Sequence, residues 1–331
     1  MDCISGSCKS LNNKAVRPIA ENIRSNRNAF LRYANRYKMR PATISTPPTR
    51  VRTLACLERL PRLSPLMSQL LARLARRNCE VPELTALIEK DPLLAGQVLR
   101  MANSAIFGRM QQITTVGHAI TMIGVGTLRK FALGNSVANL FSRFRSAPSF
   151  SMTRFNLHSV ATATLVEALV DELPVEFPEG AFIAGILHDV GRLLIAVTLP
   201  DDFESIVSLY AIKNTPLTEC ERDVLDIDHA ELSALAIGRW DLAESIQRAA
   251  RFHHTPDLAL AESDPGPGKV TLSLIINKAD EFVNYLGLSI VRPQAMNQKP
   301  PSLEFPGFQY SQERALQTFE REWKSVGDLF R

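Results

Sequence analysis

Residues 185–197 read GILHDVGRLLIAV and carry His188 and Asp189 side by side in an otherwise apolar segment. The segment is apolar nearly all the way round a helix, which predicts a central position in the fold. A buried charge is energetically costly unless it is paired or bound to a metal ion. Other parts of the chain must therefore supply partners for His188 and Asp189, or the segment is less buried than its composition indicates.

Helical periodicity extends along the chain on both sides of this segment. Apolar residues recur at three- and four-residue steps in the stretch that begins at Leu63, LSPLMSQLLARLARR. VPELTALIEKDPLLAGQVLRMANSAIF predicts two further helices, with Pro82 in the first turn of one and Pro92 at the start of the next. The alternating pattern of a β-strand is nearly absent. The sequence therefore predicts an all-α fold, a multi-helix bundle.

Turn-rich stretches predict how the chain is divided. Residues 41–50 (PATISTPPTR) have the composition of a linker, and SAPSFS, at 146–151, predicts a break between helical subdomains at about 51–145 and 150–290. Residues 291–331 begin with prolines that no helix would tolerate and end in an amphipathic helix. The apolar stripe of that helix must pack on the body of the protein or on a partner helix. The stripe consists of Leu316, Phe319, Trp323, Val326 and Phe330.

Composition indicates a globular protein rather than a membrane or secreted one. Of the 331 residues, 45% are apolar and 22% charged, and no run approaches the 18 consecutive apolar residues of a membrane span. The N-terminus, MDCISGSCKSLNNK, lacks the apolar core of a secretory signal, so we expect a cytoplasmic location. The five cysteines are odd in number and scattered, which predicts free thiols rather than disulfides. A zinc knuckle at Cys3 and Cys8 is the less favoured alternative.

The net charge of +4 comes from the N-terminal segment. Residues 1–50 hold ten Lys or Arg against Asp2 and Glu21, a balance of +8, so the remaining residues sum to −4. Through residues 9–50 such a segment could attract nucleic acid, an anionic lipid or an acidic protein surface. A solvated segment without a partner is the alternative interpretation.

Several helices direct a histidine or aspartate toward the core. His158 lies in line with apolar residues of RFNLHSVATATLVEALV, and Asp280 continues an apolar stripe in TLSLIINKADEFVNYL. Asp228 with Glu231 has the pattern of a capping box, which places His229 in the first turn of a helix. In SIQRAARFHHTP, two histidines end a helix. The candidate ligands are His158, His188, Asp189, His229, His253, His254 and Asp280.

Imidazoles combined with carboxylates suit Fe, Mn, Zn or Ni, and a set of this size could hold one ion or two. A metal-free, hydrogen-bonded cluster is the alternative. His118, the sixth histidine, has no acidic neighbour and is left out of the set.

The order His158, His188-Asp189, Asp280 resembles the H…HD…D pattern of the HD superfamily of metal-dependent phosphohydrolases. The remaining histidines complete the longer ligand set of its two-metal branch, which includes the HD-GYP phosphodiesterases. Over roughly residues 55–290 the chain is most similar to the HDOD (HD-related output) domain. The matching stretches are LPRLSPLM (60–67), EKDPLLAGQVLRMANSAIFG (89–108), HAITMIG (118–124), LHDVGRLL (187–194) and RFHHTP (251–256).

The chain departs from the HD-GYP pattern at two points. Arg192 replaces the lysine of the HDxGK motif, and nothing resembling GYP follows His254. An arginine cannot donate a proton at neutral pH, because its pKa exceeds about 12. Arg192 could instead hold a phosphate or pair with Asp189.

The resemblance implies an HD-like helical fold and leaves three hypotheses for function. The one we favour is a bacterial regulatory module that binds signalling proteins or a small, nucleotide-type ligand, with any metal in a structural role. The second is a metal-dependent phosphohydrolase with His188, Asp189 and Asp280 as core ligands. The third is nucleic-acid binding through residues 9–50, which predicts strong salt dependence.

Overall fold

Helices follow one another along nearly all of the chain that the computed structural model describes, namely residues 49–74, 80–104, 112–213, 215–262, 265–292 and 299–327. Within these ranges there is one isolated parallel bridge, Val175–Val270, and no β-strand. The predicted all-α, multi-helix fold is confirmed. Most of the basic N-terminal segment, with Cys3 and Cys8, lies outside the described residues.

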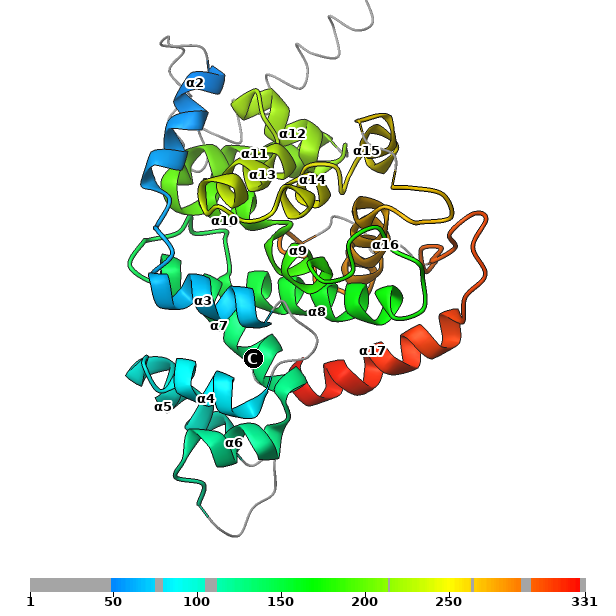
Figure 1. Cartoon of the computed structure of the whole chain (residues 1–331). Helices are drawn as coiled ribbons and strands as arrows, with labels where there is room; N and C mark the ends of the chain where they lie inside the picture. Colours follow the sequence, from blue (N-terminus) through cyan, green and yellow to red (C-terminus); the bar gives the residue numbers. More distant parts are fainter. Residues whose placement is uncertain are drawn as a thin grey trace, which may run out of the picture.

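The first helices form the lower and left-hand parts of Figure 1. They are α2 (Thr49–Leu54), the 3-10 helix η1 (Ala55–Arg59), α3 (Pro65–Leu74), α4 (Val81–Ile88), α5 (Pro92–Ala102), α6 (Val116–Ile123) and α7 (Val125–Phe141). Two of the predicted helix starts are confirmed. Pro82 lies in the first turn of α4, and Asp91 caps α5 by accepting hydrogen bonds from the backbone N–H groups of Leu93 and Leu94.

The later helices form the rest of the body, in which α8 packs against α7, α9, α16 and α17 (Figure 1). They are α8 (Met152–Val170), α9 (Ala181–Leu187), α10 (Val190–Thr198), α11 (Pro200–Lys213), α12 (Leu217–Leu225), α13 (His229–Arg239), α14 (Glu244–Arg251), α15 (Pro256–Glu262), α16 (Leu272–Tyr285) and α17 (Gln312–Val326).

The apolar segment 185–197 belongs to two helices and not to one. α9 ends at Leu187 and α10 begins at Val190, so His188 and Asp189 form the junction between them. The expectation of one continuous helix was wrong. The apolar residues continue on both sides of the junction, so the sequence pattern does not reveal the break.

One stretch of the chain passes a membrane-span criterion that the sequence was expected not to approach. The 18 residues Ala181–Thr198 have a mean hydropathy of 1.6 and are 100% buried inside the protein. Length and composition alone would allow this stretch to cross a membrane, and the core helices of a soluble protein satisfy the same criterion.

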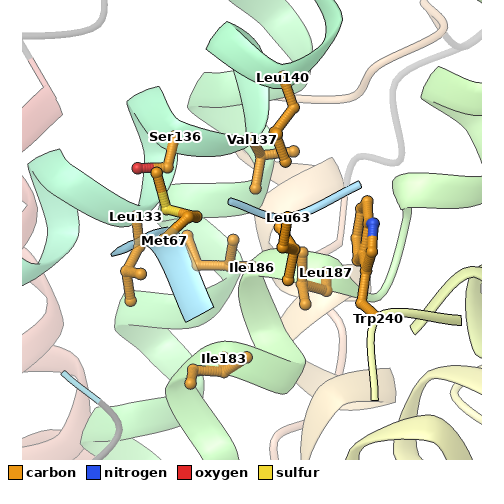
Figure 2. Close-up of a pocket in the computed structure, with 10 residues that line it drawn as sticks. All are labelled: Leu63, Met67, Leu133, Ser136, Val137, Leu140, Ile183, Ile186, Leu187 and Trp240. Carbon is orange, nitrogen blue, oxygen red and sulfur yellow. The ribbon is translucent and has the colours of Figure 1, made fainter. Parts of the chain in front are cut away.

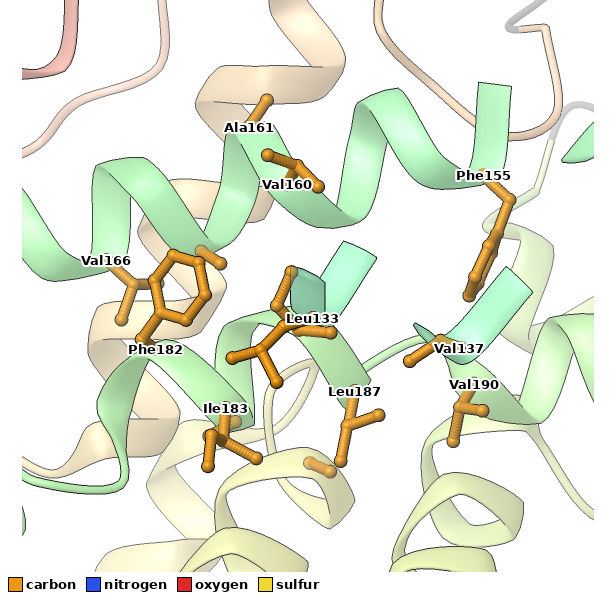
Figure 3. Packing of buried hydrophobic residues seen from close by; sticks show 14 of the residues in the cluster. Leu133, Val137, Phe155, Val160, Ala161, Val166, Phe182, Ile183, Leu187 and Val190 are labelled. Atoms are coloured by element: carbon orange, nitrogen blue, oxygen red, sulfur yellow. The ribbon is translucent and has the colours of Figure 1, made fainter. Parts of the chain in front are cut away.

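Buried side chains form one connected apolar core that runs from Cys56 to Val326. Figure 3 shows its central part, where Leu133 of α7 and Phe182 of α9 meet the side chains of α8. The predicted break at 146–151 lies between α7 and α8 and is itself packed, since Ala147 N–H donates to the carbonyl oxygen of Ala196 at 2.8 Å. The division into two subdomains stays a prediction.

A small pocket lies where α3, α7 and α9 meet (Figure 2). Ser136 is its one polar lining residue, and Trp240 closes one side. The pocket is lined by Leu63, Met67, Leu133, Ser136, Val137, Leu140, Ile183, Ile186, Leu187 and Trp240. Such a lining does not suit a phosphate or any other charged ligand.

The C-terminal helix α17 packs against α7 and α8 (Figure 1). Phe319 meets Phe282 of α16 edge to face, with ring centroids 6.5 Å apart. The ammonium of Lys130, whose side chain is 2% exposed, lies 2.7 Å from the carboxylate of Glu322. The apolar stripe therefore contacts the body of the same chain. Phe330 lies outside the described residues.

Candidate metal centre

The structure gathers all the predicted histidine and aspartate ligands into one place, named here the His–Asp cluster. Helix α8 supplies His158, and α16 supplies Asp280. The other members come from the α9–α10 junction, the start of α13 and the turn after α14. The members are His158, His188, Asp189, His229, His253, His254 and Asp280.

Local sequence explains how the later histidines are presented. Asp228 caps α13 by accepting a 2.9 Å hydrogen bond from Glu231 N–H, as the capping-box pattern predicted, so His229 is the first residue of the helix. Helix α14 ends at Arg251, so His253 and His254 lie in the turn beyond it and not in its last positions. The predicted helix end at these histidines was therefore wrong by a few residues, as predicted helix ends often are.

Two glycines beside the junction allow the neighbouring helices to come close. A Cβ on Gly185 would lie 2.6 Å from Cα of Ala163 in α8, and one on Gly191 would lie 2.2 Å from the carbonyl oxygen of His229. Gly191 N–H donates to the hydroxyl of Ser233 in α13 at 2.8 Å. Because neither glycine has a side chain, α8 and α13 can bring His158 and His229 up to Asp189.

The carboxylate of Asp189 divides the His–Asp cluster into two overlapping groups. Its Oδ2 lies 3.3 Å from Nε2 of His158 and 3.5 Å from Nε2 of His188, in the group that Asp280 completes. Its Oδ1 lies 2.9 Å from Nε2 of His229, in the group that His253 and His254 complete. Within each group the ligand atoms lie within 4.8 Å of one another. Asp189 is therefore placed to bridge two positions.

Three of the imidazoles are oriented by backbone carbonyls. Nδ1 of His158 lies 3.2 Å from the oxygen of Leu288, Nδ1 of His188 lies 2.8 Å from that of Gly185, and Nδ1 of His253 lies 2.6 Å from that of Ala250. A carbonyl oxygen only accepts, so each Nδ1 donates, and in a neutral ring Nε2 then carries a lone pair. All three Nε2 atoms point into the cluster toward Asp189, the orientation that metal-binding histidines require.

Glu221 of α12 is a member of the site that sequence reasoning missed. Its Oε2 accepts hydrogen bonds from Nδ1 of His229 at 2.6 Å and from the backbone N–H of the same residue at 2.9 Å. The side chain is 2% exposed. A carboxylate behind a histidine fixes the ring and makes the opposite nitrogen a stronger ligand.

Arg192 pairs with Asp189, which was one of its two predicted roles. Its Nη1 donates to Asp189 Oδ2 at 2.6 Å, and its Nε lies 3.6 Å from Oε1 of Glu221. The residue is 7% exposed. In this arrangement the guanidinium is directed at carboxylates inside the protein.

Opposite charges hold the two aspartates ionised. Burial acts to raise the pKa of Asp189, but Arg192 and then His188 outweigh it and hold the pKa well below its usual value. Burial also acts to raise the pKa of Asp280, but the interaction with His158, whose Nε2 lies 3.1 Å from Oδ1, outweighs burial and holds that pKa well below its usual value.

The histidines divide into two kinds. Burial acts to lower the pKa of His158, but Asp189 and Asp280 outweigh it and raise that pKa to about 9. The pKa of His229 is likewise raised to about 9, because Glu221 and Asp189 outweigh burial and the charge of Arg192. Burial lowers the pKa values of His253 and His254, so those two rings are neutral at pH 7.

The donor set fits a transition-metal ion. Asp189 Oδ1 is buried, and Nε2 of His229 lies 2.9 Å from it. The Nε2 atoms of His158 and His188 face each other at 3.3 Å, although both rings donate through Nδ1. In the metal-free site the raised pKa values of His158 and His229 place protons on their Nε2 atoms, between the facing oxygens and nitrogens. A metal ion can take the place of those protons, and imidazole with carboxylate suits Zn, Fe, Mn or Ni.

The His–Asp cluster is enclosed. Six of its seven members are buried, with Asp280 the most exposed of these at 3%, and only His254 is partly exposed. A bulky ligand could touch the metal-binding atoms of the inner residues only if the surrounding helices moved apart.

Comparison with known proteins identifies the fold family. The sequence profile of the HDOD domain matches residues 60–256. An uncharacterised protein of Treponema pallidum is 22% identical over 214 residues, which cover 63% of this chain and 40% of that relative. The chain thus spans less than half the length of this relative.

Solved structures show the same fold at low sequence identity. An HDOD domain protein of unknown function from Geobacter sulfurreducens aligns with a TM-score of 0.65 and 18% identity, covering 85% of this chain and 97% of that one. A protein of Shewanella amazonensis SB2B, provisionally named a phosphohydrolase, has a TM-score of 0.57 and 21% identity over 84% and 95% of the two chains. A protein of Marinobacter aquaeolei VT8, provisionally named for signal transduction, has a TM-score of 0.60 and 17% identity over 85% and 64%.

Proposed function

Because this chain belongs to the HDOD domain family, we propose that it is a bacterial regulatory protein of the cytoplasm. Its helical body relays a signal by binding a partner protein or a nucleotide-type ligand. The His–Asp cluster holds the helices of that body together and takes no part in turnover.

The enclosure of the His–Asp cluster carries this proposal. A phosphohydrolase must bring the phosphate of its substrate into contact with its metal ions. Here His158, His188, Asp189, His229 and His253 are all 0% exposed. A site this deeply buried suits a structural role, in which ligand binding contributes directly to folding stability.

We assign metal binding to the seven members of the His–Asp cluster, with one or two ions of Fe, Mn, Zn or Ni. A bound divalent ion supplies positive charge that stabilises the facing carboxylates and lone pairs. Glu221 and the three backbone carbonyls keep the imidazole rings oriented toward it.

Metal analysis and a hydrolysis assay on the same samples test the proposal. Untagged wild type purified without chelator should contain bound metal, Asp189→Ala should not, and removing the metal from wild type should lower its melting temperature. Wild type loaded with Mn²⁺, Fe²⁺ or Zn²⁺ should cleave a generic phosphodiester and cyclic dinucleotides no faster than Asp189→Ala does. Hydrolysis that the wild type performs and the variant lacks would contradict the regulatory assignment.

That outcome would favour the second candidate function, a metal-dependent phosphohydrolase. The observation behind it is that the complete two-group ligand set is assembled around Asp189. Partial exposure of His254 marks the side from which a substrate would have to enter. Nucleic-acid binding through residues 9–50 also stays a prediction, and deleting residues 1–48 should abolish it.

A further inference from the structure

We propose that Arg192 limits the His–Asp cluster to one divalent metal ion, because its guanidinium serves as the second cation of the site. The inference rests on the proposed metal site. It states how many ions that site binds and which residue sets this number.

The position of Arg192 is the first observation. Nη1 lies 2.6 Å from Oδ2 of Asp189, the carboxylate that both groups share. Nε of the same guanidinium lies 3.6 Å from Oε1 of Glu221, which orients His229. The positive charge of Arg192 therefore lies between the bridging carboxylate and the carboxylate that supports the second group.

The charge balance is the second observation. The site contains three buried carboxylates, those of Asp189, Asp280 and Glu221, against the one guanidinium of Arg192. Metal binding displaces the protons of His158 and His229, so in the metal-bound site the imidazoles are neutral and these groups leave two negative charges, which one divalent ion balances. A second divalent ion would leave two uncompensated positive charges in an enclosed site, and such charges are strongly unfavourable there.

Ligand geometry alone would not impose this limit. Oδ1 and Oδ2 of Asp189 face different groups, and each group offers four donor atoms. Replacing Arg192 by a neutral residue would leave the three negative charges of the carboxylates. Two divalent ions would then give the site an excess of one positive charge, whereas with Arg192 the excess is two. The second position should then bind an ion.

Four variants separate charge from structure. Arg192→Gln removes the charge, and Arg192→Lys keeps it. Lys130→Gln is the matched control, because it also removes a buried cation that is paired with a carboxylate. That carboxylate belongs to Glu322 of α17. Lys130 meets α8 near Glu167, about 13 Å along that helix from His158. Asp189→Ala removes the shared ligand and gives the background from sites elsewhere on the chain.

The measurement is bound zinc per chain, by elemental analysis after saturation with Zn²⁺ and desalting, with circular dichroism to verify folding. Above the Asp189→Ala background we expect about one ion for wild type, Arg192→Lys and Lys130→Gln, and about two for Arg192→Gln. Two ions in wild type, or one ion in a folded Arg192→Gln, would overturn the inference while leaving the metal site intact. Zinc at background level in wild type would overturn the metal site itself and this inference with it. If Arg192→Gln does not fold, the wild-type ratio still decides, since two ions there contradict the limit.

Discussion

Asp189 is the residue on which the others depend, because both of its oxygens face histidines and it also neutralises Arg192. Asp189→Ala should therefore destabilise the protein even without metal, by about 3–5 kcal/mol, since it leaves a buried guanidinium without its principal partner. Urea unfolding of metal-free protein measures this cost. Asp201→Ala, at an exposed aspartate in the first turn of α11, is the control and should change stability by less than about 0.5 kcal/mol.

A double-mutant cycle isolates the contribution of the pair. Adding Arg192→Met to Asp189→Ala removes the unpaired charge, so the double variant should be more stable than the sum of the two single effects predicts. Strict additivity would show that the contact between Asp189 and Arg192 contributes nothing to folding.

Glu221 should affect metal affinity without touching the ion. Glu221→Gln weakens the acceptor for Nδ1 of His229, so zinc affinity should fall about 10–100-fold, measured by competition with a chelating dye. Glu219→Gln changes an exposed carboxylate on the same helix and should leave the affinity unchanged. Equal losses in both variants would indicate a general charge effect rather than support of His229.

Sequence alone predicted which histidines and aspartates converge, because each interrupts an apolar helical face where a lone polar residue is costly. It did not predict Glu221. Helix α12 reads LTECERDVL, and Glu221 lies four residues from both Leu217 and Leu225, on the buried face, so its spacing predicts that it turns inward but not that it contacts His229. That contact depends on where α12 docks, which periodicity does not encode.

At the scale of elements, the close approach of α10 and α13 should be the most sensitive contact. Gly191→Ala places a Cβ against the backbone of His229, so we expect a loss of about 1–3 kcal/mol in the free energy of unfolding, together with weaker zinc binding. Chemical denaturation and zinc titration measure the two effects.

Gly96→Ala is the matched control for that prediction. Gly96 lies within α5, and an added Cβ there meets nothing within 4 Å. The substitution should stabilise the protein by about 0.5–1 kcal/mol through the loss of glycine's backbone freedom. If Gly191→Ala stabilised the protein equally, the approach of α10 to α13 would not be as close as described.

Across the whole molecule, the attachment of α17 should weaken in acid. Burial acts to raise the pKa of Glu322, but the hydrogen bond and charge of Lys130 outweigh it and lower that pKa below the ordinary 4.5. A carboxyl whose pKa is lower in the folded state stabilises the fold fully above pH 4.5, and this contribution disappears as the pH falls through the folded-state pKa. The ion pair should therefore contribute at neutral pH and not in strong acid.

Urea unfolding of Glu322→Gln against wild type checks this pH dependence. The variant should be less stable at pH 7, and the difference should shrink as the pH falls below 4.5. Glu320→Gln, at an exposed position on the same helix, should follow wild type at every pH. A difference between Glu322→Gln and wild type that does not depend on pH would contradict a role for the carboxylate charge.

The spread of the cluster along the chain has a consequence for synthesis on the ribosome. Asp280 in α16 emerges long after His158 in α8, so the ligand set cannot be complete until most of the chain has been translated. Asp189 and Arg192 are only three residues apart, and the nascent chain can pair them as soon as α10 forms. Arg192 would thus shield the central carboxylate during translation and delay ion capture until the last helices have arrived.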